Sequence, residues 1–544
     1  MDLNHIQNRN GCDDGYEFLS CWNYVPDSIL LHIFQYLTPK ELLNVGLTCQ
    51  TWNRVSYDEL LWKHLLYRNF KIDPSIPIPP GKISWYEEYK RLVYNTPIVC
   101  SEVLCEHGHQ VLHVSCSHDG TMFATSSKDG YIIVWTTKFP ARVKYSHDMK
   151  TFSWKYTQFS QFNQSDTLLL VSGVHFGTPN STSGEIAVFS LQDGFQLQCR
   201  VGNKPYDIFG TWYSNQHLLS GDLHWLAHLV SATGVWINKA SQETASEHTP
   251  ILNQLFRFYN TNASSVRAVM VADCQAEDVS AENSDCGEDE DLAEQPEKLL
   301  IFTTGSKTYT PHQIGFKRIR GVKFPTVIDP GPSLKERIAQ RDRQRAGSMS
   351  LQGPDWLNYQ AVASKFDKID HIIDLHGHII GMGLSPDHRY LYVNSRPWPD
   401  GYKITNPLDP PPIAQEIDIH VIDLAKFQEV GKMLRSHKAY TPNNECFFIF
   451  LDVSHEYVAS GAEDKHGYLW DRHYGICLAK LPHSDVVNSV AFNPVDPGML
   501  ITTSDDYLVK IWRSRAFMES VVGKEQTDNL PWAITSLQSK GSFK

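Results

Sequence analysis

Residues 483–512 read HSDVVNSVAFNPVDPGMLITTSDDYLVKIW, and this stretch decides the fold of most of the chain. Short runs of alternating apolar and polar residues are separated by turns at Pro497-Gly498 and Asp505-Asp506. Alternation with a period of two, interrupted by turn residues, is typical of β-strands joined as hairpins. The stretch therefore predicts a small antiparallel sheet.

The same arrangement recurs twice more with a fixed spacing. A Ser or Thr lies four residues before an Asp, and a Trp six residues after it, in three sets: Thr125, Asp129 and Trp135; Ser460, Asp464 and Trp470; Thr502, Asp506 and Trp512. A histidine precedes each set, at His109, His437 and His483. The pattern resembles the WD repeat, in which these four residue types form a buried hydrogen-bond set. The resemblance implies structural rather than catalytic roles, because such sets satisfy polar groups between strands.

Four less regular stretches bring the number of predicted repeats to seven. They cover 153–191, with Phe189 where a Trp would stand, and 204–238, 256–319 and 369–424. Repeats that each contain a few short strands separated by turns are typical of propeller blades. We therefore expect an all-β WD-repeat propeller of seven blades over residues 97–515. A strand at 98–105 would close the ring by pairing with the last blade, which leaves no open sheet edge. Insertions at 274–298, 320–369 and 396–416 are expected to be disordered loops.

The residues before the propeller carry helical signals. Thr38-Pro39-Lys40-Glu41 supplies an N-cap hydroxyl, a proline at the first helical position and a capping-box glutamate. Of the 47 residues from 24 to 70, 24 are apolar, which is 51% compared with 41% for the whole chain. A bundle this small cannot bury so much apolar surface by itself. We expect its surplus apolar face to bind a partner protein, the alternative being a helical cap packed on the next domain.

This helical segment resembles an F-box. The match rests on Val25-Pro26, Ile29-Leu30, Ile33-Phe34, Leu37-Thr38-Pro39, Glu41-Leu42, Cys49, Trp52-Asn53 and Leu61-Trp62, with Val25 where the family often has Leu. The resemblance implies a small all-α F-box domain over 23–70 that docks on the Skp-type adaptor of an SCF ubiquitin ligase. It assigns the adaptor contacts to Pro26, Ile29, Leu30, Ile33, Phe34 and Leu37. We expect tails at 1–22 and 516–544, and a linker at 71–96 that contains a short helix.

Composition and charge exclude several classes of function. The net charge of −12 disfavours binding to nucleic acid or to an anionic membrane surface. No apolar run approaches the length of a membrane span, and no secretory signal is evident, so we expect a cytoplasmic protein without membrane insertion. The 11 cysteines contain no CxxC pair, so they predict neither a disulfide framework nor a zinc site. Ten acidic residues lie between 276 and 297, which favours a solvated loop, an acidic docking strip being the alternative.

Motifs of catalysis are absent from the sequence, and no cofactor is predicted. No GxxxxGK[ST], GxSxG or HExxH pattern occurs, nor is there a RING-like set of Cys and His. The one metal-like group is His371, Asp374, His376 and His378. Because Gly377-His378 falls where a WD repeat places its Gly-His, we interpret these residues as structural and predict no metal.

The F-box and WD repeats together resemble the F-box/WD-repeat substrate receptors over nearly the whole chain. Runs such as 156–162, 376–386 and 440–450 extend the resemblance beyond generic WD chemistry. It implies a non-catalytic receptor that brings protein substrates to a cullin–RING E3 ligase for ubiquitination and proteasomal degradation. Two alternatives stay open. Trp470-Asp471-Arg472 resembles, imperfectly, the motif of receptors for the cullin ligase built on the damaged-DNA-binding adaptor, and a propeller can also serve as a non-degradative scaffold.

A substrate site is predicted in the 396–416 insertion. Arg396, Trp398 and Lys403 combine charge with an aromatic ring, as binding hot spots often do. We expect substrates on the propeller face that carries the turns between first and second strands together with the inter-blade connections. A phosphorylated peptide and an unphosphorylated epitope are both compatible with this composition, and a proline-stiffened loop without a binding role is the alternative.

Overall fold

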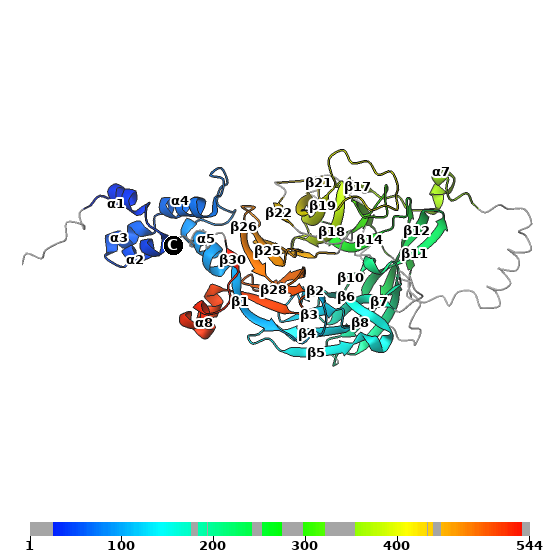
Figure 1. Ribbon diagram of the computed structural model, residues 1–544, viewed down its shortest axis with the longest axis horizontal. Coiled ribbons are helices and arrows are strands. Elements are labelled where there is room, and N and C mark those ends of the chain that lie inside the picture. The colour runs from blue at the N-terminus through cyan, green and yellow to red at the C-terminus, as the bar shows by residue number, and fades with distance from the viewer. Residues whose placement is uncertain are drawn as a thin grey trace, which may run out of the picture. The chain divides into compact units, whose positions relative to one another are not determined.

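The computed structural model of the protein comprises two compact units, residues 1–93 and 94–544. The structure describes residues 25–175, 183–192, 194–241, 253–274, 297–320, 322, 354–431, 434–438 and 448–535, with only the backbone of 434–438. The expected tail at 1–22 and nearly all of the acidic stretch lie outside these residues. The first unit is helical and the second is a seven-bladed β-propeller (Figure 1), so the predicted fold class is confirmed.

Four helices form the F-box region of the first unit: α1 (Asp27–Phe34), α2 (Pro39–Gly46), α3 (Gln50–Ser56) and α4 (Glu59–Phe70). Helix α2 begins where the capping box predicts, because the Thr38 side chain accepts from the Glu41 amide while Glu41 Oε2 accepts from the Thr38 amide at 2.8 Å. The Trp62 indole is buried and donates to the Ser56 carbonyl at 2.8 Å.

The predicted linker contains helix α5 (Trp85–Lys90) and the π-helical turn η2 (Arg91–Asn95). Tyr86 and Tyr89 of α5 pack their rings against Trp62, with centroids 4.8 and 5.4 Å apart. Asn69 of α4 also donates to the Tyr89 hydroxyl at 2.8 Å. The short helix is therefore part of the core of the first unit rather than a free spacer.

The propeller consists of seven antiparallel sheets around a central axis. In chain order the first strand of each blade is innermost, since β2 contacts β6 and β27, and β23 contacts β18 and β27. Blades 1 to 3 are β2 (Val111–Cys116) to β5 (Val143–Asp148), β6 (Trp154–Phe162) to β9 (Leu197–Asn203), and β10 (Thr211–Ser214) to β13 (Asn253–Asn260). Their middle strands are β3 (Met122–Ser127), β4 (Tyr131–Thr136), β7 (Leu168–His175), β8 (Gly184–Ser190), β11 (His217–Ala227) and β12 (Val230–Lys239).

Blades 4 to 7 complete the ring. Blade 4 is β14 (Arg267–Asp273), β15 (Lys298–Thr304), β16 (Gln313–Ile319) and β17 (His371–Asp374). Blade 5 is β18 (Gly377–Leu384), β19 (Tyr390–Pro397), β20 (Glu416–Asp423), β21 (Gln428–Glu429) and β22 (Leu434–Lys438). Blade 6 is β23 (Leu451–Val453), β24 (Tyr457–Ser460), β25 (His466–Asp471) and β26 (Cys477–Pro482), and blade 7 is β27 (Val487–Phe492), β28 (Met499–Ser504), β29 (Val509–Ser514) and β1. Single turns of 3-10 helix lie at Met149–Phe152, Tyr206–Ile208 and Ala363–Lys365.

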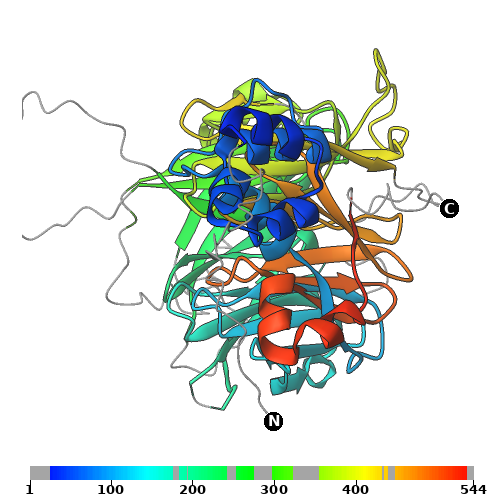
Figure 2. The same cartoon turned by 90° about the vertical axis from the view of Figure 1, so that its left-hand side faces the viewer.

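The ring closes through strand β1 (Pro97–Leu104), which pairs antiparallel with β29 of the last blade, as expected. The segment at 516–544, expected to be a tail, contains regular structure up to residue 535. Helices α8 (Arg515–Val522) and α9 (Lys524–Asp528) follow β29 as a short pair (Figure 2), and strand β30 (Ile534–Thr535) joins β26 of blade 6. Backbone bonds from Cys100 to Pro531 and from Ala533 to Ile98, both 2.8 Å, tie this segment to β1. The C-terminal segment thus fastens blade 6 to the closing blade.

A second correction concerns the insertion at 320–369. Residues 354–369 are ordered and contain helix α7 (Tyr359–Val362). Val362 and Phe366 are buried in a cluster with Ala232 of blade 3, and the Tyr259 hydroxyl donates to the Trp356 carbonyl at 2.6 Å. These apolar and aromatic residues cover the outer side of blade 3, which explains why the segment does not behave as its polar composition predicts.

Strand direction defines two ends of the propeller. We letter the strands of each blade A to D from the axis outward. Because neighbouring strands are antiparallel, the turns after first strands and after third strands lie at one end, which we call the A–B end. The turns between second and third strands and the inter-blade connections lie at the other, the B–C end. The expectation that first-to-second turns and inter-blade connections share a face is therefore wrong. The 396–416 insertion joins β19 to β20, so it lies at the B–C end.

Candidate functional site

An exposed apolar face on the first unit is the first candidate binding surface. Ile29 and Ile33 of α1 are 51% and 41% exposed, and Leu47 after α2 is 83% exposed. Tyr36 and Leu43 are exposed as well. Aliphatic and aromatic side chains gathered in this way on so small a unit indicate a surface that a partner covers.

The six predicted adaptor contacts divide into two groups. Pro26, Ile29 and Ile33 are exposed, and Leu37 is half-buried. Leu30 and Phe34 are buried, and the Phe34 ring packs edge-on against Trp52 with centroids 5.5 Å apart. These two side chains belong to the core of the helical unit, because they lie on the face of α1 that meets α3. Their assignment as adaptor anchors is therefore revised, whereas the exposed residues keep that prediction.

The polar sets of the propeller are hydrogen-bond relays in two blades. In blade 7 the Trp512 indole donates to Thr502 Oγ1 at 2.9 Å, the Thr502 hydroxyl lies 2.7 Å from His483 Nε2, and His483 Nδ1 lies 2.9 Å from Asp506. Burial lowers the pKa of His483, so the neutral ring donates from Nδ1. Burial alone would raise the pKa of Asp506, but the His483 hydrogen bond and two backbone amides lower it to about 2.

Blade 1 contains the same relay with one difference. Trp135 donates to Thr125 at 3.0 Å, and His107, not His109, lies 2.8 Å from both Thr125 and Asp129. The prediction for His109 is therefore wrong, since its ring packs instead against Tyr507 at 5.4 Å. The spacing could have identified the right residue. His107 lies 22 residues before its Asp and His483 lies 23 before its own, whereas His109 lies only 20 before Asp129.

The set predicted for blade 6 differs further. The Tyr468 hydroxyl donates to Asp464, and the Asp464 carboxylate also accepts from the His466 amide at 3.3 Å. Ser460 accepts from the Asn394 side chain at 2.9 Å, and Trp470 is buried against Tyr468. The side chain of His437 lies outside the described residues, so its pairing stays a prediction.

Two of the three residues predicted to bind substrate are buried. Arg396 has no exposed surface, forms an ion pair with Glu463 and donates to the Ala414 carbonyl at 2.6 Å. Trp398 is also buried, with its ring against His312 at 4.9 Å. The prediction is wrong for both residues, because β19 continues to Pro397 and buries Arg396 against Glu463 of blade 6, while Trp398 packs against His312 of blade 4 and His378 of blade 5. Lys403 is exposed on the loop.

A cavity of about 770 Å³ at the A–B end is the second candidate binding site. It lies in the mouth of the central channel, and first-to-second turns of the blades line it, among them His118, Ser214, His388 and Pro494. Phe159, Phe209, Phe448 and Phe450 also line it and pack against one another, with centroids 4.9–6.3 Å apart. A pocket of this size with an aromatic wall and a few polar groups is typical of a ligand site.

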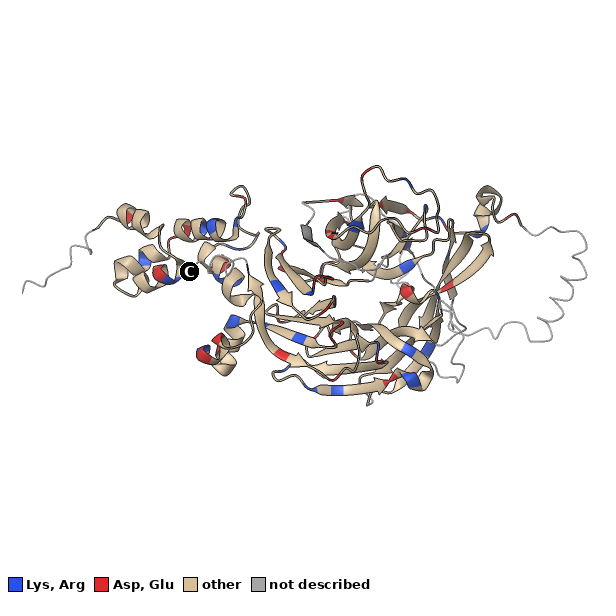
Figure 3. Cartoon of the chain, in the orientation of Figure 1, with Lys and Arg blue, Asp and Glu red and all other residues tan. Residues whose placement is uncertain are grey.

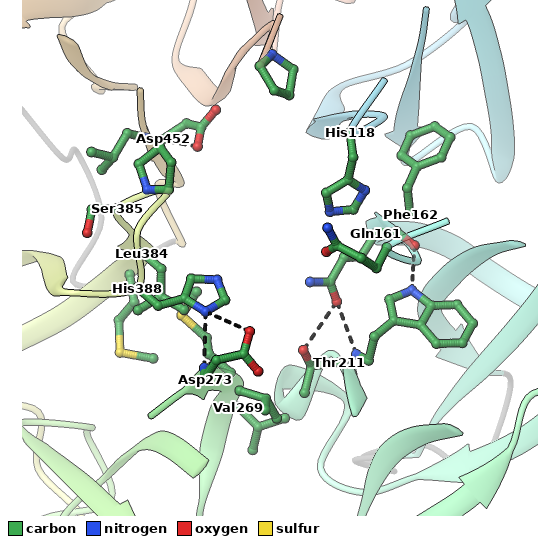
Figure 4. Close-up of a pocket in the computed structure, with 18 of the residues that line it drawn as sticks. His118, Gln161, Phe162, Thr211, Val269, Asp273, Leu384, Ser385, His388 and Asp452 are labelled. Atoms are coloured by element: carbon green, nitrogen blue, oxygen red, sulfur yellow. Dashed lines mark hydrogen bonds and ion pairs between the residues drawn. The ribbon is translucent and has the colours of Figure 1, made fainter. Parts of the chain in front are cut away.

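Three polar side chains from different blades face this cavity (Figure 4). His388 Nδ1 lies 3.0 Å from the Asp273 amide nitrogen and 3.3 Å from the Asp273 carboxylate, so Nε2 is the ring nitrogen that is left for a ligand. His118 Nδ1 lies 2.9 Å from Asp166, so its Nε2 is likewise left for a ligand. Gln161 Oε1 accepts from Thr211 and from the Trp212 amide, which leaves its amino group as a donor. The cavity therefore offers the amide donor of Gln161 and two imidazole nitrogens at fixed positions.

Asp452 of β23 is the carboxylate of the cavity. Its two oxygens accept from the Val453 and Phe492 amides at 2.8 and 2.7 Å. Burial raises its pKa to about 6, although these two hydrogen bonds oppose the shift. Burial, and after it the charge of Asp452, raise the pKa of the Cys116 thiol well above the usual value, so this thiol stays neutral. Among the described residues no cation pairs with Asp452 within 4 Å.

The metal-like residues of blades 4 and 5 do not assemble. His371 packs against Phe316 and Phe427, and His376 pairs with Asp374 at 3.3 Å. His378 lies 3.1 Å from the Pro411 carbonyl, and burial lowers its pKa to about 4. Within the described ranges no group of three or more His, Cys, Asp or Glu could hold a metal ion.

Charge and hydropathy of the described residues give no sign of a nucleic-acid stripe or a membrane helix. Lys and Arg are interspersed with Asp and Glu over the propeller (Figure 3). No helix in the described part of the chain is long and apolar enough to cross a membrane. Arg472, which suggested the damaged-DNA-binding adaptor, donates to the Tyr392 hydroxyl at 2.9 Å and packs on the Tyr390 ring. These contacts hold Arg472 within the propeller and disfavour that alternative.

The cavity residues were missed by the sequence analysis. They come in small groups from the first strands and the following turns of all seven blades, and no local spacing connects them. One candidate signal was present: His388 occupies a turn position with φ 53°, where Gly120 stands in blade 1 with φ 68°. Asp166 has the equivalent position in blade 2 with φ 54°, so a residue other than glycine at this position does not by itself identify the site.

Comparisons with known proteins agree with both units. A family model described as F-box-like matches residues 22–68, and one described as WD domain, G-beta repeat matches 99–136 and 475–513. F-box/WD repeat-containing protein 5 of Mus musculus is 45% identical over 561 aligned residues, which cover 90% of this chain and 93% of the relative. The protein of the same name in Homo sapiens is 44% identical over 90% of this chain and 94% of its own length. F-box/WD repeat-containing protein pof10 of Schizosaccharomyces pombe is 36% identical over 66 residues, 12% of this chain and 10% of the relative.

Proposed function

Because the chain belongs to the F-box/WD-repeat family, we propose that it is the substrate receptor of an SCF-type cullin–RING E3 ubiquitin ligase. The helical unit docks on the Skp-type adaptor, which connects it to the cullin scaffold. The propeller binds proteins that the ligase then ubiquitinates for proteasomal degradation. The chain itself contributes no catalytic group, and the complex works in the cytoplasm.

The exposed apolar face of the helical unit supports this proposal most directly. Ile29, Ile33 and Leu47 expose aliphatic surface that folding of the unit leaves uncovered. Burying such surface against a partner is favourable by about 25 cal/mol per Å². The face lies on the helices that the F-box family model covers, so the adaptor is the partner expected to cover it.

The test is to replace Ile29 and Ile33 together by alanine. Fully burying an isoleucine side chain is worth roughly 1.5–3 kcal/mol, and about half of each side chain is already covered in the free protein. Each substitution should therefore cost about 1 kcal/mol of adaptor binding, and the pair about 30-fold in affinity. Titration of the full-length chain against purified Skp-type adaptor measures this loss.

Ile83→Ala is the matched control, since Ile83 is 94% exposed and lies outside the helices. It should leave both adaptor affinity and melting temperature unchanged. An unaltered affinity in the Ile29/Ile33 variant would contradict adaptor docking through this face. A non-degradative scaffold makes a different prediction in cells, because loss of adaptor binding would then leave the half-lives of propeller-bound proteins unchanged.

A further inference from the structure

The cavity at the A–B end has the chemistry of a cation-binding site. We propose that it binds a peptide segment of a partner protein and takes up an arginine or lysine side chain between its aromatic wall and Asp452. The proposal rests on the proposed function only in so far as the peptide belongs to a protein that the receptor presents for ubiquitination. The binding chemistry itself is independent of the ligase.

The aromatic wall supplies faces for a cation. Phe450 of blade 6 lies 6.1 Å from Phe159 of blade 2 and 5.6 Å from Phe209, centroid to centroid. The wall therefore spans the channel from one side to the other. Phe159 and Phe450 keep part of their surface exposed, and both line the cavity. A guanidinium or ammonium group over such a ring is attracted by its quadrupole, most strongly where water is excluded.

Asp452 supplies the opposite charge. It follows Phe450 by two residues, so the two side chains leave the strand on the same face. Leu451 and Val453, on the other face, are buried in the core between blades 5 and 6. Asp452 is half-buried, and among the described residues no cation lies within 4 Å of its carboxylate. An incoming Arg or Lys would provide that partner.

The remaining polar groups suit a peptide. The amino group of Gln161 can donate to a peptide carbonyl, and the Nε2 atoms of His388 and His118 can each form a hydrogen bond with a peptide group. These groups lie on opposite sides of the cavity (Figure 4). A volume of about 770 Å³ exceeds what one side chain fills. Several peptide residues can therefore enter with the cationic one.

Charge in the lining disfavours an anionic ligand. The lining contains three aspartates, Asp273, Asp387 and Asp452, and one lysine, Lys298. Lys298 is paired with Asp273 at 2.7 Å. Recognition of a phosphate group requires clustered arginines or free amides, and the lining contains no arginine. Of the two kinds of peptide left open by the sequence, this cavity fits an unphosphorylated, basic one.

A bead-displayed heptapeptide library tests the proposal. The central position is fixed as Arg, Lys, citrulline or Leu, and the other six are random but exclude charged residues and Cys. Citrulline has the shape of arginine without its charge. Fluorescently labelled full-length protein should bind Arg and Lys beads about tenfold more often than citrulline beads, as expected for a desolvated charge pair. Equal capture of Arg and citrulline beads, preference for Leu, or no capture at all would overturn the proposal.

Two variants assign the selectivity to the cavity. Asp452→Asn keeps the side-chain size and should abolish the preference for Arg over citrulline. Phe450→Leu keeps an apolar wall without a ring and should reduce it. Asp222→Asn, an aspartate in β11 paired with His224 outside the cavity, is the matched control and should keep it. If the preference for Arg over citrulline survives in both cavity variants, or is lost in the control, the preference does not come from the cavity.

The Ile29/Ile33 variant separates this proposal from the proposed function. It should lose adaptor binding and keep the preference for Arg beads. If the wild-type chain fails to bind the adaptor but keeps the preference, the ligase role fails and the peptide site stands. If adaptor binding is normal and the preference is absent, the peptide site fails and the ligase role stands.

Discussion

Asp452→Asn should make the propeller more stable at neutral pH, although it removes a charged residue from the interior. Burial raises the pKa of Asp452 from 3.8 to about 6. The folded state therefore binds more protons than the unfolded state between these two values, and stability falls as pH rises through this window. Asparagine has the size of the protonated side chain and never ionises, so the variant should escape this loss.

The magnitude follows from the shift. A difference of about 2.2 units corresponds to roughly 3 kcal/mol, at about 1.36 kcal/mol per unit. The lost acceptor for the Val453 or Phe492 amide offsets about 1 kcal/mol of it. For a propeller of about 400 residues the unfolding entropy is roughly 0.8 kcal/mol per degree, so the expected rise in melting temperature is about 2–3 °C.

Thermal melts of the wild type and the variant at several pH values test the reasoning. With the lost acceptor included, the stability difference should be largest above pH 7, about a third as large near pH 5 and absent or slightly reversed at pH 4, because the wild-type carboxylate is then protonated in the folded state. Asp222→Asn should change stability by less than about 0.5 kcal/mol at any of these pH values, since its ion pair is exposed. A stabilisation that does not depend on pH, or a variant less stable at pH 7, would refute an uncompensated charge at Asp452.

Three other outcomes can be measured in the same way. Asp506→Asn should destabilise the propeller by about 2–4 kcal/mol in denaturant melts, because the His483 and backbone donors lose a charged acceptor. In the wild type, the ionised Asp506 should contribute roughly 2 kcal/mol of stability above about pH 4, and this contribution should be lost as the pH falls to about 2. Arg396→Ala should cost about 3–5 kcal/mol because it removes the cation that pairs with buried Glu463, so binding lost with normal stability would show instead that Arg396 contacts ligands. Deletion of 276–297, a stretch rich in charge and poor in apolar residues, should change the melting temperature by less than a few degrees.

The repeat pattern predicts the propeller well because it reports local chemistry. The spacing from Thr502 to Asp506 to Trp512 reflects the length of one hairpin, and the same hairpin recurs in blade 1 with Thr125, Asp129 and Trp135. The identity of the partnering histidine depends on the connection between blades, which varies in length. Two histidines flank Gly108, and the distance to the Asp, 22 residues for His107 against 23 for His483, distinguishes His107 from His109.

Burial was the property that the sequence could not supply for the candidate sites. Arg396 looks like a surface residue in a proline-rich loop, yet β19 continues far enough to bury it against Glu463. Leu30 and Phe34 have the same residue character as Ile29 and Ile33 but point to the opposite side of α1. The cavity depends on turns from seven blades meeting around one axis, and no window of sequence contains that arrangement.

Asp506 and Asp452 distinguish a structural carboxylate from one available to a ligand. Asp506 accepts from the His483 ring and from two backbone amides, and its pKa is lowered to about 2. Asp452, in the neighbouring blade, has two backbone donors and no cation among the described residues, and its pKa is raised to about 6. Folding therefore stabilises the first charge and opposes the second. A residue that lowers stability while it lines an aromatic cavity is better explained by what the cavity binds than by the fold.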